Sequence, residues 1–268
     1  MSLAYAAPSQ FFPWEPESTV RANLAIGELR QTLLKRGHGS AAHAATLLSA
    51  AGAMVGFAAQ NAALEQGEIL SQRRDLVAPK SLLLFENAHG ERFLLGSWIN
   101  GPLLMGYGHA YPLLTFLAKA GAAVGLSKAT FPDINAIERR VAAAIKQPGF
   151  GAVPAPEGHK LAAEPRPLLR ALWPRARKIL TAPIPIHLSD EPPLDEAHWP
   201  MILSIVAGKL ITMSKDLICP GVALGLVMES ALVASRLDPE LVDPGRWRLA
   251  PGRAGLQIAK AEAFRRMG

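Results

Sequence analysis

Two charged residues lie inside the most apolar part of the chain and are the first candidates for chemistry. Residues 199–236 predict two helices separated by the break at Cys219-Pro220-Gly221, because proline favours the first turn of a helix. Lys209 and Glu229 each have large apolar residues at helical spacings around them, so each faces the apolar side of its helix. A lysine and a carboxylate in an apolar setting can transfer protons or bind a polar group. Lys209 and Glu229 are therefore the candidate catalytic residues.

The same two residues are expected to pair. Lys209 lies about as far before the break as Glu229 lies after it, so an antiparallel helical hairpin would bring them level. Burying either charge alone is expensive, whereas burying both as an ion pair is tolerable. Such a pair more often fixes the register of two helices than it carries chemistry. A Lys209 side chain that reaches out to solvent is a further alternative.

A second polar group precedes these helices and consists of His187, Asp190, Glu191, Asp195, Glu196 and His198. Imidazole and carboxylate groups are ligands for hard or borderline metal ions, so Asp195 and His198 are candidate metal ligands. The favoured alternative is structural, because acidic residues complement a helix N-terminus and Asp195 is a good N-cap. The chain has no P-loop, dinucleotide-binding, nucleophile-elbow or zinc-protease motif. We expect no cofactor.

The end of the chain is basic. Residues 244–268 hold six Lys or Arg residues and one Glu, a local charge of +5 in a chain of net charge +6. Such a tail could meet an acidic partner, anionic lipid or nucleic acid, and Trp247 and Phe264 could stack on bases. The favoured alternative is a short terminal helix, on which Leu256, Ala259 and Phe264 dock against the body. Nucleic-acid binding is therefore not the expected role.

Helical patterns dominate the rest of the chain. Ser18, Ser40 and Asp133 are expected N-caps, Gly67 is expected to end the second helix, and Pro174 is expected to break the fifth. The expected helices cover residues 18–36, 40–66, 111–125, 133–147, 168–180, 199–215 and 220–236. Residues 81–86 and 92–96 predict an antiparallel hairpin around the turn 87–90, with a third short strand near 103–105.

A stripe of small residues runs along the second helix, at Ala45, Ser49, Gly52 and Gly56. Small side chains let another backbone approach closely, which indicates tight packing of helices within the chain or, alternatively, a dimer face.

The composition favours a large, ordered core. Hydrophobic residues make up 50% of the 268 residues and charged residues 19%, and the mean hydropathy is +0.17. The fold class expected is α+β, predominantly α-helical, with about seven or eight helices and one small antiparallel β-hairpin. We expect one domain over 1–268, with a candidate boundary in the Pro- and Gly-rich segment 147–167.

Compartment and membrane placement follow from weaker signals. The single Cys219 excludes an intrachain disulfide framework and a cysteine-based zinc site, and we expect a soluble, cytoplasmic protein. The apolar stretches Ala41–Ala59 and Leu217–Ser235 contain His43 and Glu229 respectively. They are interpreted as buried core helices, so no membrane span is expected.

Three functions remain open at this point. The favoured one is a non-enzymatic protein that acts through protein–protein contacts and self-associates, as a homodimer, through the small-residue stripe or the C-terminal helices. The second is an enzyme or carrier that binds a small apolar ligand between helices, with Lys209, Glu229 or the Asp195–His198 group supplying polarity. The third is nucleic-acid binding through the basic tail.

Overall fold

The computed structural model describes most of the chain. The described residues are 15–35, 40–72, 82–104, 111–145, 147–148, 150–154, 159, 161–182, 195–247 and 257–260. They form an α+β fold of eight α-helices and three short strands, so the predicted helical class with one antiparallel hairpin is confirmed.

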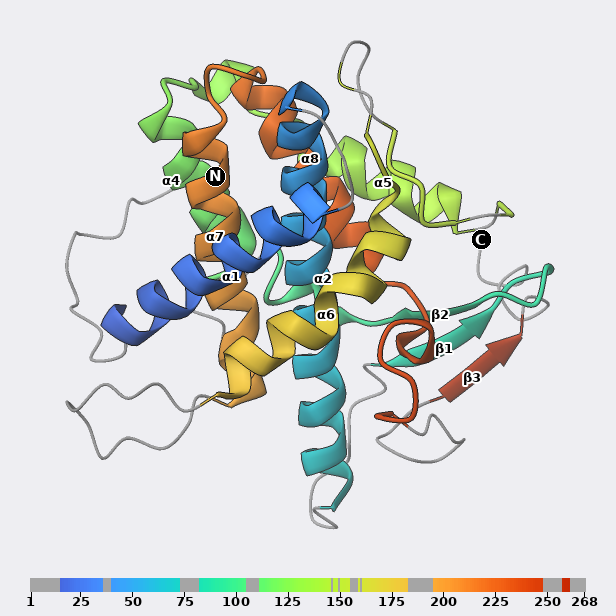
Figure 1. Ribbon diagram of the computed structural model, residues 1–268. Coiled ribbons are helices and arrows are strands. Elements are labelled where there is room, and N and C mark those ends of the chain that lie inside the picture. The colour runs from blue at the N-terminus through green and yellow to red at the C-terminus, as the bar shows by residue number, and fades with distance from the viewer. Residues whose placement is uncertain are drawn as a thin grey trace.

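Helix α2 (Ser40–Gln72) runs through the centre of the fold (Figure 1). Helices α1 (Glu15–Lys35) and α6 (Pro165–Thr181) cross its front, and α7 (Trp199–Met213) and α8 (Pro220–Ala234) also pack on it. Residues 48–64 of α2 are buried without interruption, and many of them are alanine. Alanine suits this position because it favours helix and lets neighbouring helices approach closely.

The closest helix contact joins α2 to α8. Gly52 lies against the backbone of Val227, and Gly56 lies against the backbone of Ala231. Because each pair advances by four residues along both helices, α2 and α8 run parallel at this crossing. The hydroxyls of Ser49 and Ser230 are both buried and lie 2.8 Å apart in a hydrogen bond between the two helices. The predicted small-residue stripe therefore serves packing within the chain, and the predicted dimer face along it is wrong because α8 covers it.

Polar side chains fasten the ends of the helices around this crossing. Gln60 of α2 donates from Nε2 to the carbonyl oxygens of Ser235 and Leu237, which follow α8. Buried Arg21 of α1 donates from Nη1 to the carbonyl oxygens of Ile179 and Leu180, near the end of α6. Both contacts satisfy carbonyl groups that a helix end leaves without an intrahelical partner.

The strands form one small sheet beside the helices. β1 (Leu83–Glu86) pairs antiparallel with β2 (Arg92–Leu95), so that Glu86 faces Arg92 across the ladder. The Oδ1 atom of Asn87 accepts hydrogen bonds from the backbone of His89 and Glu91, and Gly90 takes a positive φ of 75°. These two residues make the predicted tight turn. β3 (Gln257–Lys260) pairs parallel with the other edge of β1.

The remaining helices are α3 (Ser97–Asn100), α4 (Leu113–Ala123) and α5 (Ile134–Ala144), with 3₁₀ turns at 128–130, 196–198 and 239–241. Asp133 caps α5 as predicted, since its side chain accepts from the backbone N–H of Ala136. Pro220 occupies the first turn of α8 as predicted. Arg236, which follows α8, donates to Asn100 of α3, and burial lowers the pKa of its guanidinium to about 10.

Five predicted details of the elements are wrong. α1 begins at Glu15, so Ser18 lies inside the helix instead of at its N-cap. α2 continues through Gly67 to Gln72, because one glycine inside a packed helix costs only about 1 kcal/mol. α6 continues through Pro174, which lies on its exposed side, where water can hydrate the carbonyl group that loses its partner. Residues 97–104 form α3 and a turn instead of leading into a strand at 103–105; Met105 lies outside the described residues. Residues 257–260 form a strand rather than part of a terminal helix.

Helix α2 also contains a window that could cross a membrane by length and composition alone. Residues 44–67 include an 18-residue window of mean hydropathy 1.4, and 94% of that window is buried inside the structure. A core helix that other helices surround can have the same length and hydropathy. α8, in the second apolar stretch of the sequence, is likewise covered, and Ala223 and the residues from Leu226 to Ala234 are buried.

The α2–α8 contact predicts the effect of adding a single methyl group. A Cβ atom at Gly52 or Gly56 would overlap the backbone oxygen of Val227 or Ala231, so the helices must separate. We expect Gly52→Ala and Gly56→Ala each to lower the free energy of unfolding by about 2 kcal/mol or more, measured by urea denaturation. Gly225→Ala on α8 is the matched control, because nothing lies within 4 Å of its Cβ position. It should leave stability unchanged or raise it by up to about 1 kcal/mol. Equal effects at all three glycines would contradict the close contact.

Candidate functional site

An open groove of about 740 Å³ lies between α1, α4 and α7. We call it the three-helix groove. Its walls are mostly apolar, with Ile26 from α1, Phe116 from α4, and Ile205 and Met213 from α7. The space arises where α4 and α7 cross through small residues. A Cβ atom at Gly208 would lie 3.8 Å from the Cβ of Ala120, which is ordinary contact, so no large side chain fills the crossing.

Polar side chains line this groove from all three helices. Lys119 comes from α4, Lys209 from α7, and Thr19 and Asn23 from α1. The Nζ atom of Lys209 donates to Oδ1 of Asn23 at 2.8 Å, which holds the ammonium group beside α1. Among the described residues, neither lysine has an acidic side chain within ion-pair distance. The groove thus combines mostly apolar walls with two cations that no described acidic residue neutralises.

The predicted ion pair between Lys209 and Glu229 is wrong. Glu229 is buried and instead accepts two hydrogen bonds from Arg140 of α5, at 2.7 Å from Nε and 2.9 Å from Nη2. The hydrogen bond to Glu229 raises the pKa of the Arg140 guanidinium. α7 and α8 do not form the predicted helical hairpin, because both pack chiefly on α2 and little on each other. Of the two candidate catalytic residues, only Lys209 lines the groove.

The candidate metal ligands lie together. Nδ1 of His198 is 2.7 Å from Oδ1 of Asp195, and both side chains are more than a third exposed. Asp195 stands at the N-cap of the 3₁₀ turn 196–198, but its carboxylate contacts His198 instead of a backbone N–H of that turn. Within the described part of the chain, no group of three or more His, Cys, Asp or Glu residues could hold a metal ion. His187, Asp190 and Glu191 lie outside the described residues.

The described part of the basic C-terminal segment is fastened to the body. Arg246 forms a partly buried ion pair with Glu196, and its guanidinium carbon lies 5.0 Å from the ring centre of Trp247 and 5.9 Å from that of Trp199. Trp247 in turn donates from Nε1 to Asn61 of α2 at 2.8 Å. Arg246 and Trp247 are therefore engaged within the chain. Phe264 lies outside the described residues.

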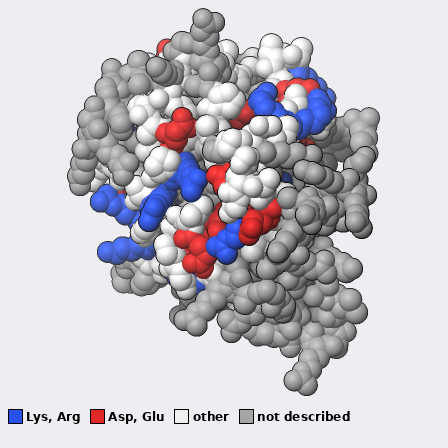
Figure 2. Space-filling model, turned by 90° about the vertical axis from the view of Figure 1, so that its right-hand side faces the viewer, with Lys and Arg blue, Asp and Glu red and all other residues white. Residues whose placement is uncertain are grey.

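The surface of one face carries charges of both signs. Figure 2 shows Lys and Arg side chains interspersed with Asp and Glu side chains on the side that faces right in Figure 1. Among the described residues on that face, the basic side chains form no continuous surface of the kind that binds a phosphate backbone.

Sequence reasoning missed Lys119, Asn23 and Arg140. In α4, Leu113, Leu117 and Ala120 predict the buried side, whereas Phe116, Lys119 and Ala123 follow the same spacing on an adjacent side. This second, partly apolar side of α4 is the feature of the sequence that could have indicated a groove. No comparable signal links Arg140 to Glu229, because their contact depends on how α5 packs against α8.

Comparison of the chain with known protein families, curated proteins and solved structures found no match.

The Arg140–Glu229 contact predicts a stability effect. Arg140→Ala would leave the buried Glu229 carboxylate without its cationic partner. The side chain of Arg140 is 50% exposed, so water offsets part of the loss, and we expect the free energy of unfolding to fall by about 1–2 kcal/mol. Chemical denaturation measures this difference. Arg139→Ala on the same helix should change stability by less than about 0.5 kcal/mol, because Arg139 is 72% exposed and lies 3.9 Å from Asp133. If Arg140→Ala left the free energy of unfolding unchanged, Glu229 would not depend on this partner.

Proposed function

We propose that this protein binds an elongated apolar molecule with an anionic head group, such as a fatty acid, in the three-helix groove. The observation that carries the proposal is that Lys119 and Lys209 line an apolar groove from two different helices and have no acidic partner among the described residues.

The shape and lining of the groove support a ligand of this class. Its volume of about 740 Å³ lies within the roughly 300–1,000 Å³ that is usual for small-molecule sites. An acyl chain would cover Ile26, Phe116, Ile205 and Met213, and each Å² of apolar surface removed from water contributes about 25 cal/mol. The driving force for binding is therefore burial of the chain.

The charge at the edge supports an anionic rather than a neutral head group. A carboxylate near Lys119 and Lys209 would neutralise two cations, and Asn23 already orients the ammonium group of Lys209. This role makes Lys209 a binding residue instead of a catalytic one. Glu229 takes no part, since its carboxylate is bound to Arg140 away from the groove.

A specific observation favours self-association as a second candidate function. Large apolar side chains are exposed on α1 and at the end of α7, with Leu24 at 52% and Met213 at 57% exposed. Met213 also lines the groove, and Leu24 follows Asn23, a lining residue, along α1. A second copy of the chain seated there would make a homodimer through α1 and α7.

Calorimetric titration with palmitate tests the ligand proposal. We expect saturable binding by the intact protein, and about tenfold weaker binding by Lys119→Gln combined with Lys209→Gln. That factor corresponds to two partly exposed ion pairs of about 0.7 kcal/mol each. Gly208→Leu should abolish binding, because its side chain would project into the groove from α7. Lys178→Gln, at an exposed position on α6, is the matched control and should bind as the intact protein does.

Two outcomes would reject the ligand proposal. One is the absence of saturable palmitate binding, and the other is equal binding by the intact protein and Gly208→Leu. Light scattering in the same buffer tests self-association, the second candidate function. A dimer that Leu24→Glu and Met213→Glu each dissociate would support self-association, whereas a monomer at every concentration would exclude it.

A further inference from the structure

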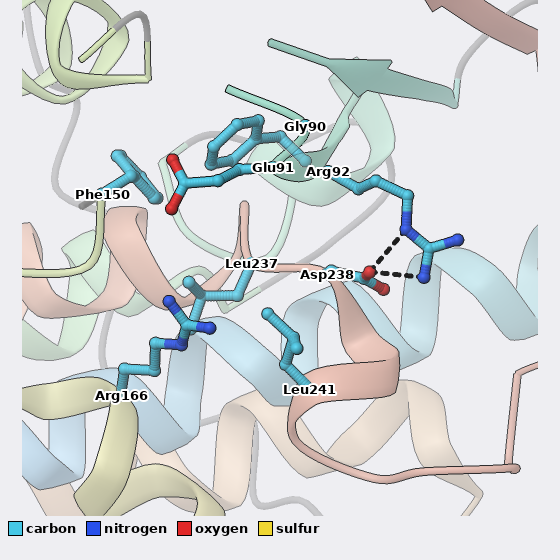
Figure 3. A pocket seen from close by; sticks show the side chains of 9 residues that line it. Gly90, Glu91, Arg92, Phe150, Arg166, Leu237, Asp238 and Leu241 are labelled. Atoms are coloured by element: carbon cyan, nitrogen blue, oxygen red, sulfur yellow. Dashed lines mark hydrogen bonds and ion pairs between the residues drawn. The ribbon is translucent and has the colours of Figure 1, made fainter. Parts of the chain in front are cut away.

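A second, smaller hollow of about 230 Å³ lies outside the three-helix groove, and we call it the hairpin hollow (Figure 3). It is formed by the turn and first residues of β2, by Phe150, by Arg166 near the start of α6, and by Leu237, Asp238 and Leu241 after α8. The two cavities share no residue. Their functions can therefore be tested separately.

Two opposite charges face this hollow without pairing with each other. Figure 3 shows the Glu91 carboxylate and the Arg166 guanidinium on the same side of the hollow with a gap between them. No ion pair joins Glu91 to Arg166, and among the described residues Arg166 has no hydrogen-bond or ion-pair partner. A ligand that carries one cation and one anion can contact both groups at once, so an unpaired charge of each sign in one hollow favours a ligand with the complementary charges.

The fold holds both charged side chains in place. Nδ2 of Asn87 donates to Oε2 of Glu91 at 3.1 Å, and the Asn87 side chain also binds the hairpin backbone. Gly151, with a φ of 124°, lies against the stem of Arg166, and its Cβ position is 3.5 Å from Cδ of that arginine. A larger residue at 151 would be strained by its backbone and would crowd Arg166. Glu91 is thus held by the hairpin turn, and Arg166 extends from the start of α6 past Gly151.

The rest of the lining is apolar or neutralised. The rings of Phe93 and Phe150 meet edge to face with their centres 5.1 Å apart. Leu237 and Leu241 line the hollow beside them. The other charged pair, Arg92 with Asp238, is closed by an ion pair of 2.6 Å and offers no free charge. A ligand would therefore meet one anion, one cation and an apolar wall.

We propose that the hairpin hollow binds a small zwitterion with the chemistry of an apolar α-amino acid. Its ammonium group would contact Glu91, its carboxylate would contact Arg166, and its side chain would lie against Phe150, Leu237 and Leu241. The volume supports a ligand of this size, since it is below the roughly 300 Å³ at which sites for drug-sized molecules begin.

Calorimetric titration of the full chain with L-alanine, L-leucine and L-phenylalanine tests this proposal. We expect at least one of them to bind saturably with a Kd of about a millimolar or lower. Arg166→Gln and Glu91→Gln should each weaken that binding about tenfold or more, because each removes a hydrogen-bonded charge contact. Arg170→Gln and Glu86→Gln are the matched controls, since both residues are exposed and lie outside the lining. Both controls should bind as the intact protein does.

Derivatives of the bound amino acid test the two contacts without changing the protein. The methyl ester lacks the carboxylate and the N-acetyl derivative lacks the ammonium group, so each should bind about tenfold more weakly than the free amino acid. The proposal is overturned if none of the three amino acids binds when its concentration reaches about ten times the expected Kd of about a millimolar. It is also overturned if both derivatives bind as well as the parent, or if Arg166→Gln and Glu91→Gln bind normally. None of these results bears on the proposal that palmitate binds in the three-helix groove.

Discussion

The contact between α2 and α8 is the constraint on which the rest of the structure depends. Glycines at 52 and 56 let two helix backbones touch, and the Ser49–Ser230 hydrogen bond satisfies two hydroxyl groups buried between them. Because α8 occupies this side of α2, α7 must pack on another side. That separation places Glu229 beside α5 and leaves Lys209 at the edge of the groove with α1 and α4.

Much of the fold could be predicted because it is encoded locally. Asp133 and Pro220 mark helix starts by their own chemistry. Asn87 and Gly90 make a turn within four consecutive residues. The errors arose where distant packing outweighs a local preference. Gly67 and Pro174 are poor helix residues, yet both sit inside helices that the core holds. The partner of β1 at 257–260 lies far along the chain, so no local pattern indicated it.

The candidate sites were less predictable because they depend on which helices meet. Periodicity identified Lys209 and Glu229 as charges on apolar sides, and nearness in the sequence grouped Asp195 with His198. It could not identify their partners, since Asn23 and Arg140 come from helices far away in the sequence. The hairpin hollow was not predicted at all. Glu91 and Arg166 are unremarkable in the sequence, and only the fold brings a turn residue and a helix start to one cavity.

Disulfide trapping tests the α2–α8 contact most directly. In a Cys219→Ala background, Ser49→Cys with Ser230→Cys should form a disulfide on oxidation, which peptide mass spectrometry detects, because the native hydroxyls lie 2.8 Å apart. Ser49→Cys with Ser235→Cys should not, since Ser235 lies beside Gln60, about 16 Å further along α2. A disulfide in the first variant alone is the predicted result. No disulfide in the first, or equal yields in both, would contradict the parallel contact and with it the arrangement of both cavities.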